Sequence, residues 1–218
     1  MRILLSAILV LVMSAFGMGC SDGDAGGPVV PCDTRFCACS DGVTVEDTAT
    51  GLLWERKTTT GDVHDVTNTY SWSSSPAGSA ADGTAYSVFL ADLNTSPGFA
   101  GHTDWRLPII SELQSILVGL GVDTVAIAEP ADPASGQNAA GQATTCGGPP
   151  CIDSGFSIVG GPTGWGLHPR SVNHWSASSF ASAPDFAWDA GFGNGLLSGN
   201  SKTEVNFVRA VRAGSCSS

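Results

Sequence analysis

The sequence has few basic residues. Nine Lys and Arg stand against 20 Asp and Glu in 218 residues, so the formal net charge is −11 at pH 7. If a leader that carries Arg2 is removed, eight basic residues remain and the net charge becomes −12. A chain this acidic repels a phosphate backbone, and we therefore predict no nucleic-acid partner.

The sequence also lacks the residue spacings that hold a metal ion. No two histidines are separated by four positions, as two ligands on one helix face would be. Calcium requires clustered carboxylates, and the close pair Asp22 and Asp24 lies in the N-terminal segment outside the domain. We predict no metal site and no cofactor.

Catalytic motifs are missing as well. The chain has no Gly-x-Ser-x-Gly elbow and no recognisable pair of general acid and base, so we predict that it is not an enzyme. Its 28 glycines and 12 prolines indicate many loops. Roughly 180 residues beyond the N-terminal segment are enough for one domain with its own core.

The N-terminus has the layout of a secretory signal, which we place at residues 1–19. Arg2 precedes an apolar run from Ile3 to Met18, shorter than the about 20 apolar residues of a membrane span. The small residues before Cys20 resemble a bacterial lipobox, although Gly17 replaces the usual aliphatic residue. We expect Cys20 to carry a lipid that inserts into the bilayer, with residues 20–31 as a flexible tether. The alternative is simple secretion.

An exported lipoprotein of this kind is expected in the cell envelope. Ser21, directly after the cysteine, favours the outer membrane by analogy with bacterial sorting rules.

Cysteine parity agrees with lipidation, because seven cysteines leave one unpaired and removing Cys20 leaves six. Six cysteines allow fifteen connectivities. The short Gly-Gly-Pro-Pro spacing predicts a Cys146–Cys151 bridge, and a second bridge should join the two ends of the domain. The cysteines available for that staple are Cys32, Cys37, Cys39 and Cys216.

Apolar periodicity predicts a loop-rich α+β chain. Residues 43–47 and 52–56 should form a hairpin, and later strands should include 173–176, 186–192 and 205–212 with turns between them. A helix should begin at Asp82 and bury residues at a spacing of four: Ala85, Phe89 and Leu93.

A second helix should begin at Ser111, with Gln114 completing a capping box, and end before Gly119. Residues 121–171 have poor periodicity and should form a long surface excursion.

Several motifs occur in an order that resembles the Lcl C-terminal domain family. They are Asp47 to Trp54 (DTATGLLW), Ala100 to Pro108 (AGHTDWRLP), Glu112-Leu113, Trp175 to Ser178 (WSAS) and Val208 to Arg212 (VRAVR). The resemblance covers nearly all of residues 32–218. It implies a C-type-lectin-like fold, with two helices packed on a small, twisted, mostly antiparallel sheet and with long loops.

The resemblance also implies a bacterial surface or secreted protein that binds a ligand. One branch of the family is an adhesin domain for sulfated glycans, but this chain lacks that branch's collagen-like stalk and its acidity disfavours a polyanion. The calcium-dependent motifs of animal lectins, Glu-Pro-Asn and Trp-Asn-Asp, are absent. We expect a glycan or another envelope or surface protein as the partner.

The residues of the family motifs could form a sugar-stacking platform, but we interpret them as structural. This set consists of Trp54, Asp104, Trp105, Arg106, Leu107, Pro108, Glu112, Trp175, Trp188, Arg209 and Arg212. The ligand is expected instead at polar and aromatic residues in the turns between the closing strands, although ordinary turn chemistry would also explain the asparagines. These candidates are Phe180, Asp185, Phe186, Asn194, Asn200, Lys202 and Asn206.

Two other functions stay open. The formylglycine-generating enzymes share a related fold and use a cysteine pair, which Cys146 and Cys151 resemble; however, no basic group near this pair lowers a thiol pKa, and an oxidising compartment favours a closed bridge. The chain could also be a structural module that binds other envelope proteins.

Overall fold

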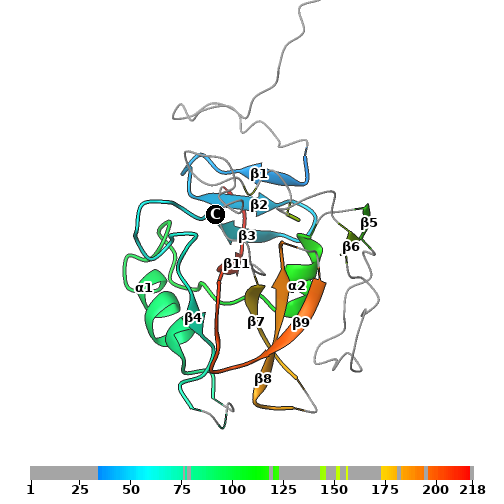
Figure 1. Cartoon of the computed structure of the whole chain (residues 1–218). Helices are drawn as coiled ribbons and strands as arrows, with labels where there is room; N and C mark the ends of the chain where they lie inside the picture. Colours follow the sequence, from blue (N-terminus) through cyan, green and yellow to red (C-terminus); the bar gives the residue numbers. More distant parts are fainter. Residues whose placement is uncertain are drawn as a thin grey trace, which may run out of the picture.

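The computed structural model of the chain contains mostly β-strands and two short helical segments (Figure 1). It describes residues 34–75, 77, 80–117, 120–122, 143–145, 151–152, 156, 173–180, 183–193 and 196–216. Neither helical segment in these ranges is long and apolar enough to span a membrane. The predicted signal and tether, residues 1–31, lie outside the described residues.

The first sheet has four antiparallel strands in the order β1-β2-β3-β11. Its strands are β1 (Phe36–Ala38), β2 (Thr44–Asp47), β3 (Leu52–Glu55) and β11 (Val211–Ala213). The predicted opening hairpin is confirmed as β2–β3. In its turn the Asp47 carbonyl accepts the amides of Thr50 and Gly51, and Gly51 has a φ of +68°, which glycine adopts without strain. Figure 1 shows the C-terminus beside this sheet.

A second sheet contains β7 (Asn173–Ser179), β8 (Phe186–Gly191) and β9 (Leu196–Ser201), all antiparallel. The predicted strands at 173–176 and 186–192 are confirmed. The interpretation of the following segment as a turn is wrong, because six residues of β9 pair with β8. Its Ser, Gly and Asn composition is typical of a turn, and only the neighbouring strand makes it extended.

The predicted closing strand at 205–212 is two strands rather than one. β10 (Val205–Asn206) pairs with β4 (Tyr70–Ser71), and β11 joins the first sheet. Between them Val208, Arg209 and Ala210 are buried. The predicted antiparallel pairing is present, but the strands form separate sheets instead of the single sheet that was expected.

The predicted surface excursion at 121–171 contributes to the interior. β5 (Leu120–Val122) pairs with β6 (Ala143–Thr145), and three residues further along the chain are almost fully buried. They are Cys151, Ile152 and Phe156. The expectation failed because these few apolar residues stand among Gly and Pro and show no period.

The first helical segment consists of a π-helical part, η1 (Ala85–Leu90), and α1 (Ala91–Leu93). Its predicted buried residues are confirmed, since Ala85, Phe89 and Leu93 are at most 1% exposed. Asp82 does not cap it: the carboxylate accepts the Ser74 amide at 2.8 Å instead.

The second helix, α2 (Ile110–Ser115), begins one residue earlier than predicted. The predicted cap by Ser111 and Gln114 is wrong. Ile109 is the N-cap residue, and the Glu112 carboxylate accepts its backbone amide at 2.8 Å. Glu112 stands three residues after the N-cap, the position from which a carboxylate reaches back.

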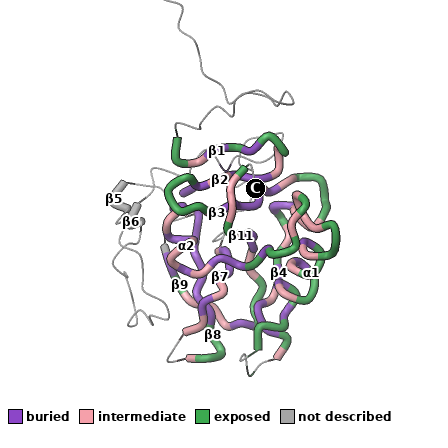
Figure 2. Tube along the Cα trace, turned by 180° about the vertical axis from the view of Figure 1, so that it is seen from behind, coloured by how far each residue is buried: buried purple, intermediate pink, exposed green. Residues whose placement is uncertain are grey.

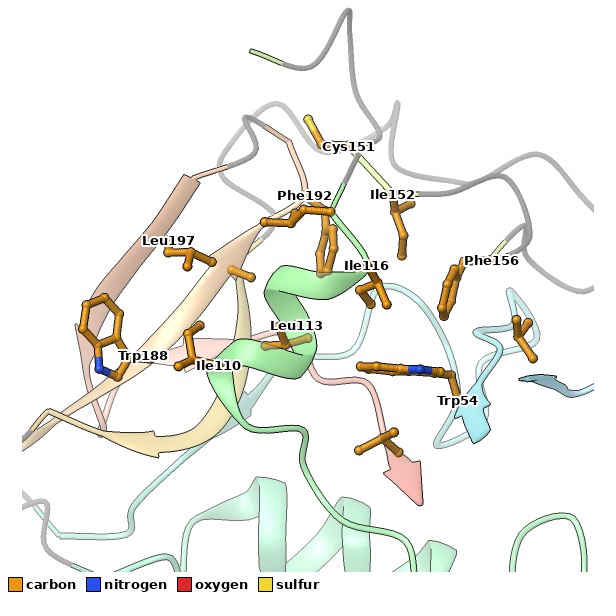
Figure 3. Close-up of a cluster of buried hydrophobic side chains, with 14 residues drawn as sticks. Trp54, Ile110, Leu113, Ile116, Cys151, Ile152, Phe156, Trp188, Phe192 and Leu197 are labelled. Atoms are coloured by element: carbon orange, nitrogen blue, oxygen red, sulfur yellow. The ribbon is translucent and has the colours of Figure 1, made fainter. Parts of the chain in front are cut away.

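The buried side chains form two clusters on opposite sides of β3. One packs α2 against β7 and β8 and includes Trp54, Phe156 and Trp188 (Figure 3). The other lies under η1 and α1 and includes Leu53 and Trp175. Leu53 and Trp54 are consecutive in β3 and therefore point to opposite faces, so one strand joins both clusters. Figure 2 shows the buried segments of both in the interior.

Candidate functional site

Two of the recognised motifs are hydrogen-bonded to each other. Arg106 and Val211 exchange backbone hydrogen bonds of 3.0 and 2.9 Å, and the Arg212 side chain donates to the Asp104 carboxylate at 2.7 Å. We call residues 104–108 together with β3 and β11 the motif frame. Its three segments are far apart in sequence, and β11 joins them by pairing with β3 and bridging to Arg106.

Trp105 is fixed within the frame on all its polar atoms. Its indole N–H donates to the Phe99 carbonyl at 2.9 Å, and the side-chain amide of Asn94 bonds both its backbone N–H and its carbonyl at 2.8 Å. Leu107 and Pro108 are buried beside it, and the Pro108 carbonyl accepts the Ala177 amide at 2.7 Å. The motif therefore joins the first helical segment to the second sheet.

Arg106 and Glu112 form a two-point ion pair of 2.8 and 2.7 Å at the start of α2. The Glu112 hydrogen bond raises the pKa of Arg106 above its usual value. The Arg106 side chain is 45% exposed, so solvent screens the pair and it contributes at most about 1 kcal/mol. Its main role is to orient the carboxylate that caps the helix.

Glu55 is the centre of a buried polar cluster. One carboxylate oxygen lies 2.9 Å from the Lys57 ammonium and 2.7 Å from Nδ1 of His64. The other oxygen accepts the Ala210 amide at 2.9 Å, and the Glu55 carbonyl accepts the Arg209 guanidinium at 2.6 Å. Both ends of the described domain thus meet at one carboxylate.

The pKa values of this cluster reflect both burial and pairing. Burial alone would raise the pKa of Glu55, but the charge of Lys57 and the His64 hydrogen bond bring it below its usual value. Burial lowers the pKa of Lys57 against the attraction of Glu55, and it lowers the pKa of Arg209 to about 10. The cluster holds charges in the interior only because each has a partner.

The β7–β8 tip, by which we mean Phe180, Pro184, Asp185 and Phe186, lies at the opposite end of the molecule from β1–β3 (Figure 1). The Phe180 ring stacks on Trp188, with centroids 4.1 Å apart and planes at 15°, and Phe186 approaches Phe180 edge-on at 6.3 Å. Phe186 is 36% exposed, whereas Trp188 is buried. The three rings form an aromatic ladder from the core to the surface.

Gly199 makes the ladder possible. A Cβ built on this β9 residue collides with the Phe180 ring, so only glycine lets that ring lie flat on the sheet. Gly199 faces Trp188 across the strands, which places Phe180 over both.

The predicted ligand residues do not all meet at the tip. Asn200 neighbours Gly199 in β9 and therefore points to the opposite face of the sheet, where Ala187 is its cross-strand partner. Asn206 lies in β10, half-buried, opposite Tyr70 in another sheet. Asn194 lies outside the described residues.

Lys202 was expected among the exposed contacts, but the structure buries it. Its ammonium lies 3.9 Å from the Trp72 ring centroid and donates to the Pro184 carbonyl at 2.6 Å. Its backbone amide also donates to the Asp185 carbonyl at 2.9 Å. Lys202 therefore stabilises the backbone of the tip through the carbonyls of Pro184 and Asp185, and its ammonium already contacts the Trp72 ring.

Asp189 lies on the same face of β8 and β9 as Asn200. Ser198 donates to one carboxylate oxygen at 2.7 Å, while the other oxygen is buried and has no hydrogen-bond partner among the described residues. Burial raises the pKa of Asp189 to about 7.

No three His, Cys, Asp or Glu side chains gather as metal ligands within the described ranges.

The predicted bridge between the two ends of the domain is confirmed as Cys39–Cys216, a sequence separation of 177. Cys37 and Cys151 are disulfide-bonded as well. Cys32, Cys146 and Cys20 lie outside the described residues, so the Cys146–Cys151 pairing stays a prediction.

The residues that sequence reasoning missed are buried polar groups and one glycine. Glu55 and Lys57 are two apart after a buried tryptophan, a spacing that could have indicated a paired charge on one strand face. Asn94, Asp189 and Gly199 carry no comparable signal, because their partners lie in other elements.

Comparison with known proteins agrees with the motifs. The family model of the Lcl C-terminal domain matches residues 43–212, which include the Glu55 cluster, residues 104–108 and the sheet of β7, β8 and β9. No curated protein and no solved structure matches the chain. The resemblance inferred from the motifs is thereby confirmed, and the chain belongs to the Lcl C-terminal domain family.

Proposed function

We propose that the chain is a lipid-anchored protein of the bacterial cell envelope that binds a glycan through the β7–β8 tip and has no enzymatic activity. The observation that carries the proposal is the exposed Phe186 ring, supported from behind by Phe180 and Trp188. A flat aromatic ring offers the apolar face of a sugar a rigid contact with little loss of side-chain entropy.

The polar groups around the ring support the same role. Asp185 is exposed next to Phe186, and Lys202 donates hydrogen bonds to the carbonyls of Pro184 and Asp185. A rigid tip lowers the entropic cost of binding. With a net charge of −11 the protein should favour a neutral or amino sugar over a sulfated one.

The fold that we propose for the whole domain is the C-type-lectin-like one. Adjacent domain ends joined by a disulfide, two short helical segments and antiparallel pairing support it. An experimentally determined structure compared with known lectin-like domains tests this part of the proposal.

A glycan array tests the binding function. The full chain with Cys20→Ser, secreted without lipid, should bind a defined set of glycans, and Phe186→Ala should abolish most of the signal. Val205→Ala is the matched control, since Val205 is also an exposed apolar residue but lies in β10. Asn200→Ala reports on the opposite face of the sheet. Loss of binding with Asn200→Ala but not with Phe186→Ala, or no glycan bound, would overturn the proposal.

Two further measurements test the envelope role and the absence of catalysis. Metabolic labelling with a fatty-acid analogue should mark the native chain in membranes and not the Cys20→Ser variant. Thiol titration of the folded protein should find no reactive thiol at Cys146 or Cys151. Two reactive thiols at these positions would restore the formylglycine-generating comparison.

A further inference from the structure

A groove of about 530 Å³ lies between the first helical segment and the loop of residues 61–70. Its lining includes Asp62, Val63 and Tyr70 from the loop side, and Val88 and Asp92 from η1 and α1. None of its lining residues belongs to the β7–β8 tip. It is therefore a second surface feature, separate from the proposed glycan site.

The groove carries negative charge and no compensating cation. Asp62 and Asp92 line it, and no Lys, Arg or His does. The ammonium of Lys57, in the neighbouring Glu55 cluster, is already paired with the Glu55 carboxylate at 2.9 Å.

The electrostatic environment of Tyr70 agrees with this description. Burial raises the pKa of its hydroxyl, and the charges of Glu55, Asp92 and Asp62 raise it further. Asp62 is held in the ionised form: its burial is outweighed by hydrogen bonds from Thr60 and Thr58, which lower the pKa of its carboxyl.

The lining of the groove also includes the apolar residues Val63 and Val88, among polar ones. Val88 is 51% exposed, and Val63 is partly buried against the cluster that includes Tyr70. A ligand that suits this surface has an apolar stem and a cationic head. Lys and Arg side chains have this form, burying their methylene groups along apolar surface while the charge stays in water.

We propose that this groove binds a Lys or Arg side chain of a protein partner, with the stem on Val88 and Val63 and the charged head between Asp62 and Asp92. Charge complementarity selects the partner, because an acidic surface attracts a basic one and repels other acidic chains. A domain with this second surface can attach to a basic envelope protein while its tip stays free for a glycan.

Nuclear magnetic resonance titration tests the proposal on the full chain carrying Cys20→Ser. The probe is Nα-acetyl-L-arginine amide, and its neutral analogue Nα-acetyl-L-citrulline amide has the same shape without the charge. The arginine probe should shift the amide signals of residues 61–70 and 87–95 saturably, and the citrulline probe should not. Raising the salt concentration should weaken the binding.

Substitutions locate the interaction. Asp92→Asn should weaken the arginine probe about two- to fivefold, the range of an exposed ion pair. Asp92 makes no hydrogen bond through its side chain in the described structure that this change would break, so the fold should persist. Glu204→Gln, which removes an exposed carboxylate outside the groove, and Phe186→Ala should leave the affinity unchanged.

The contrary results are distinct. Equal binding of the citrulline probe, unchanged affinity in Asp92→Asn, or shifts spread evenly over all surface carboxylates would overturn the proposal. A groove that binds D-glucosamine more tightly than the arginine probe would also overturn it, because the partner would then be an amino sugar. None of these results depends on what the tip binds, since Phe186→Ala tests that separately.

Discussion

The motif frame and the β7–β8 tip are built on different principles. The frame is held by polar contacts: Arg106 and Val211 exchange two backbone hydrogen bonds, and the Glu55 carboxylate contacts Lys57, His64 and Ala210. At the tip the order comes from stacked rings, with Phe186 half open to solvent. A change at a buried polar group of the frame should therefore cost stability, whereas the exposed side chains of the tip can vary without disturbing the frame.

Two buried carboxylates show the difference most clearly. Glu55 in the frame has cationic partners that hold its pKa below the usual value, whereas Asp189 beside the tip has only Ser198, and burial raises its pKa to about 7. A buried charge without a counter-charge is neutralised by binding a proton. Each of the following predictions separates the two regions.

Removing the Cys39–Cys216 disulfide should have the largest effect on stability. The double variant Cys39→Ser/Cys216→Ser frees a loop of 177 residues, and the chain-entropy model predicts a loss of about 5 kcal/mol in the free energy of unfolding. Urea unfolding monitored by tryptophan fluorescence measures it. A loss below about 1 kcal/mol would show that the frame holds without its covalent closure.

The second largest loss of stability is expected from removing the charge of Glu55. Glu55→Gln leaves Lys57 buried without a counter-charge, and the expected cost is about 3 to 5 kcal/mol in the free energy of unfolding. The control is Asp104→Asn, which breaks an ion pair whose carboxylate is 59% exposed and should cost less than about 1 kcal/mol. Equal costs would remove the distinction between buried and exposed pairs.

Local patterns predicted several elements in and around the frame because these elements have clear signals. The hairpin of β2 and β3 follows from alternation and a Gly51 turn, and the first helix from apolar residues four apart. The staple followed from the cysteines at the two ends of the domain. Each of these signals lies within a few residues of the element or concerns a rare residue type.

The missed features depend on distant partners. Glu55 meets Ala210 across 155 positions, and Lys202 is buried because Trp72 lies beneath its ammonium. β9 is extended because β8 lies beside it, although its own residues favour turns. Such contacts are decided by the tertiary fold, and no local pattern in the sequence contains them.

The Asp189 carboxyl should make stability depend on pH in the direction opposite to Glu55. Its pKa is about 7 in the folded state and near 4 when unfolded, so between these values only the folded state keeps the proton. The free energy of unfolding should fall by about 3 kcal/mol as the pH rises from 4 to 7, relative to Asp189→Asn. Urea unfolding of both proteins across that range measures the difference. Parallel pH profiles would contradict the burial of an unpaired carboxyl.

Displacing Phe180 should have the smallest effect on stability. Gly199→Ala forces the ring off the sheet and should cost about 1 kcal/mol, because Phe180 is only partly buried and can move outward. Glycan binding should fall while the frame stays intact, as measured by the array and by urea unfolding. Val205→Ala is the control, because it changes an exposed side chain outside the tip. Gly42→Ala is unsuitable, because the positive φ of Gly42 would itself strain an alanine. A loss of several kcal/mol would mean that the tip is part of the frame.

Native-state hydrogen exchange of the unaltered protein tests the central claim most directly. The amides of Glu55, Arg106 and Val211 should exchange only through global unfolding, whereas those of Phe180 and Phe186, bonded within the tip, should exchange through local opening at least about 2 kcal/mol lower. Equal opening free energies in the two regions would contradict a stable frame that carries an independent tip.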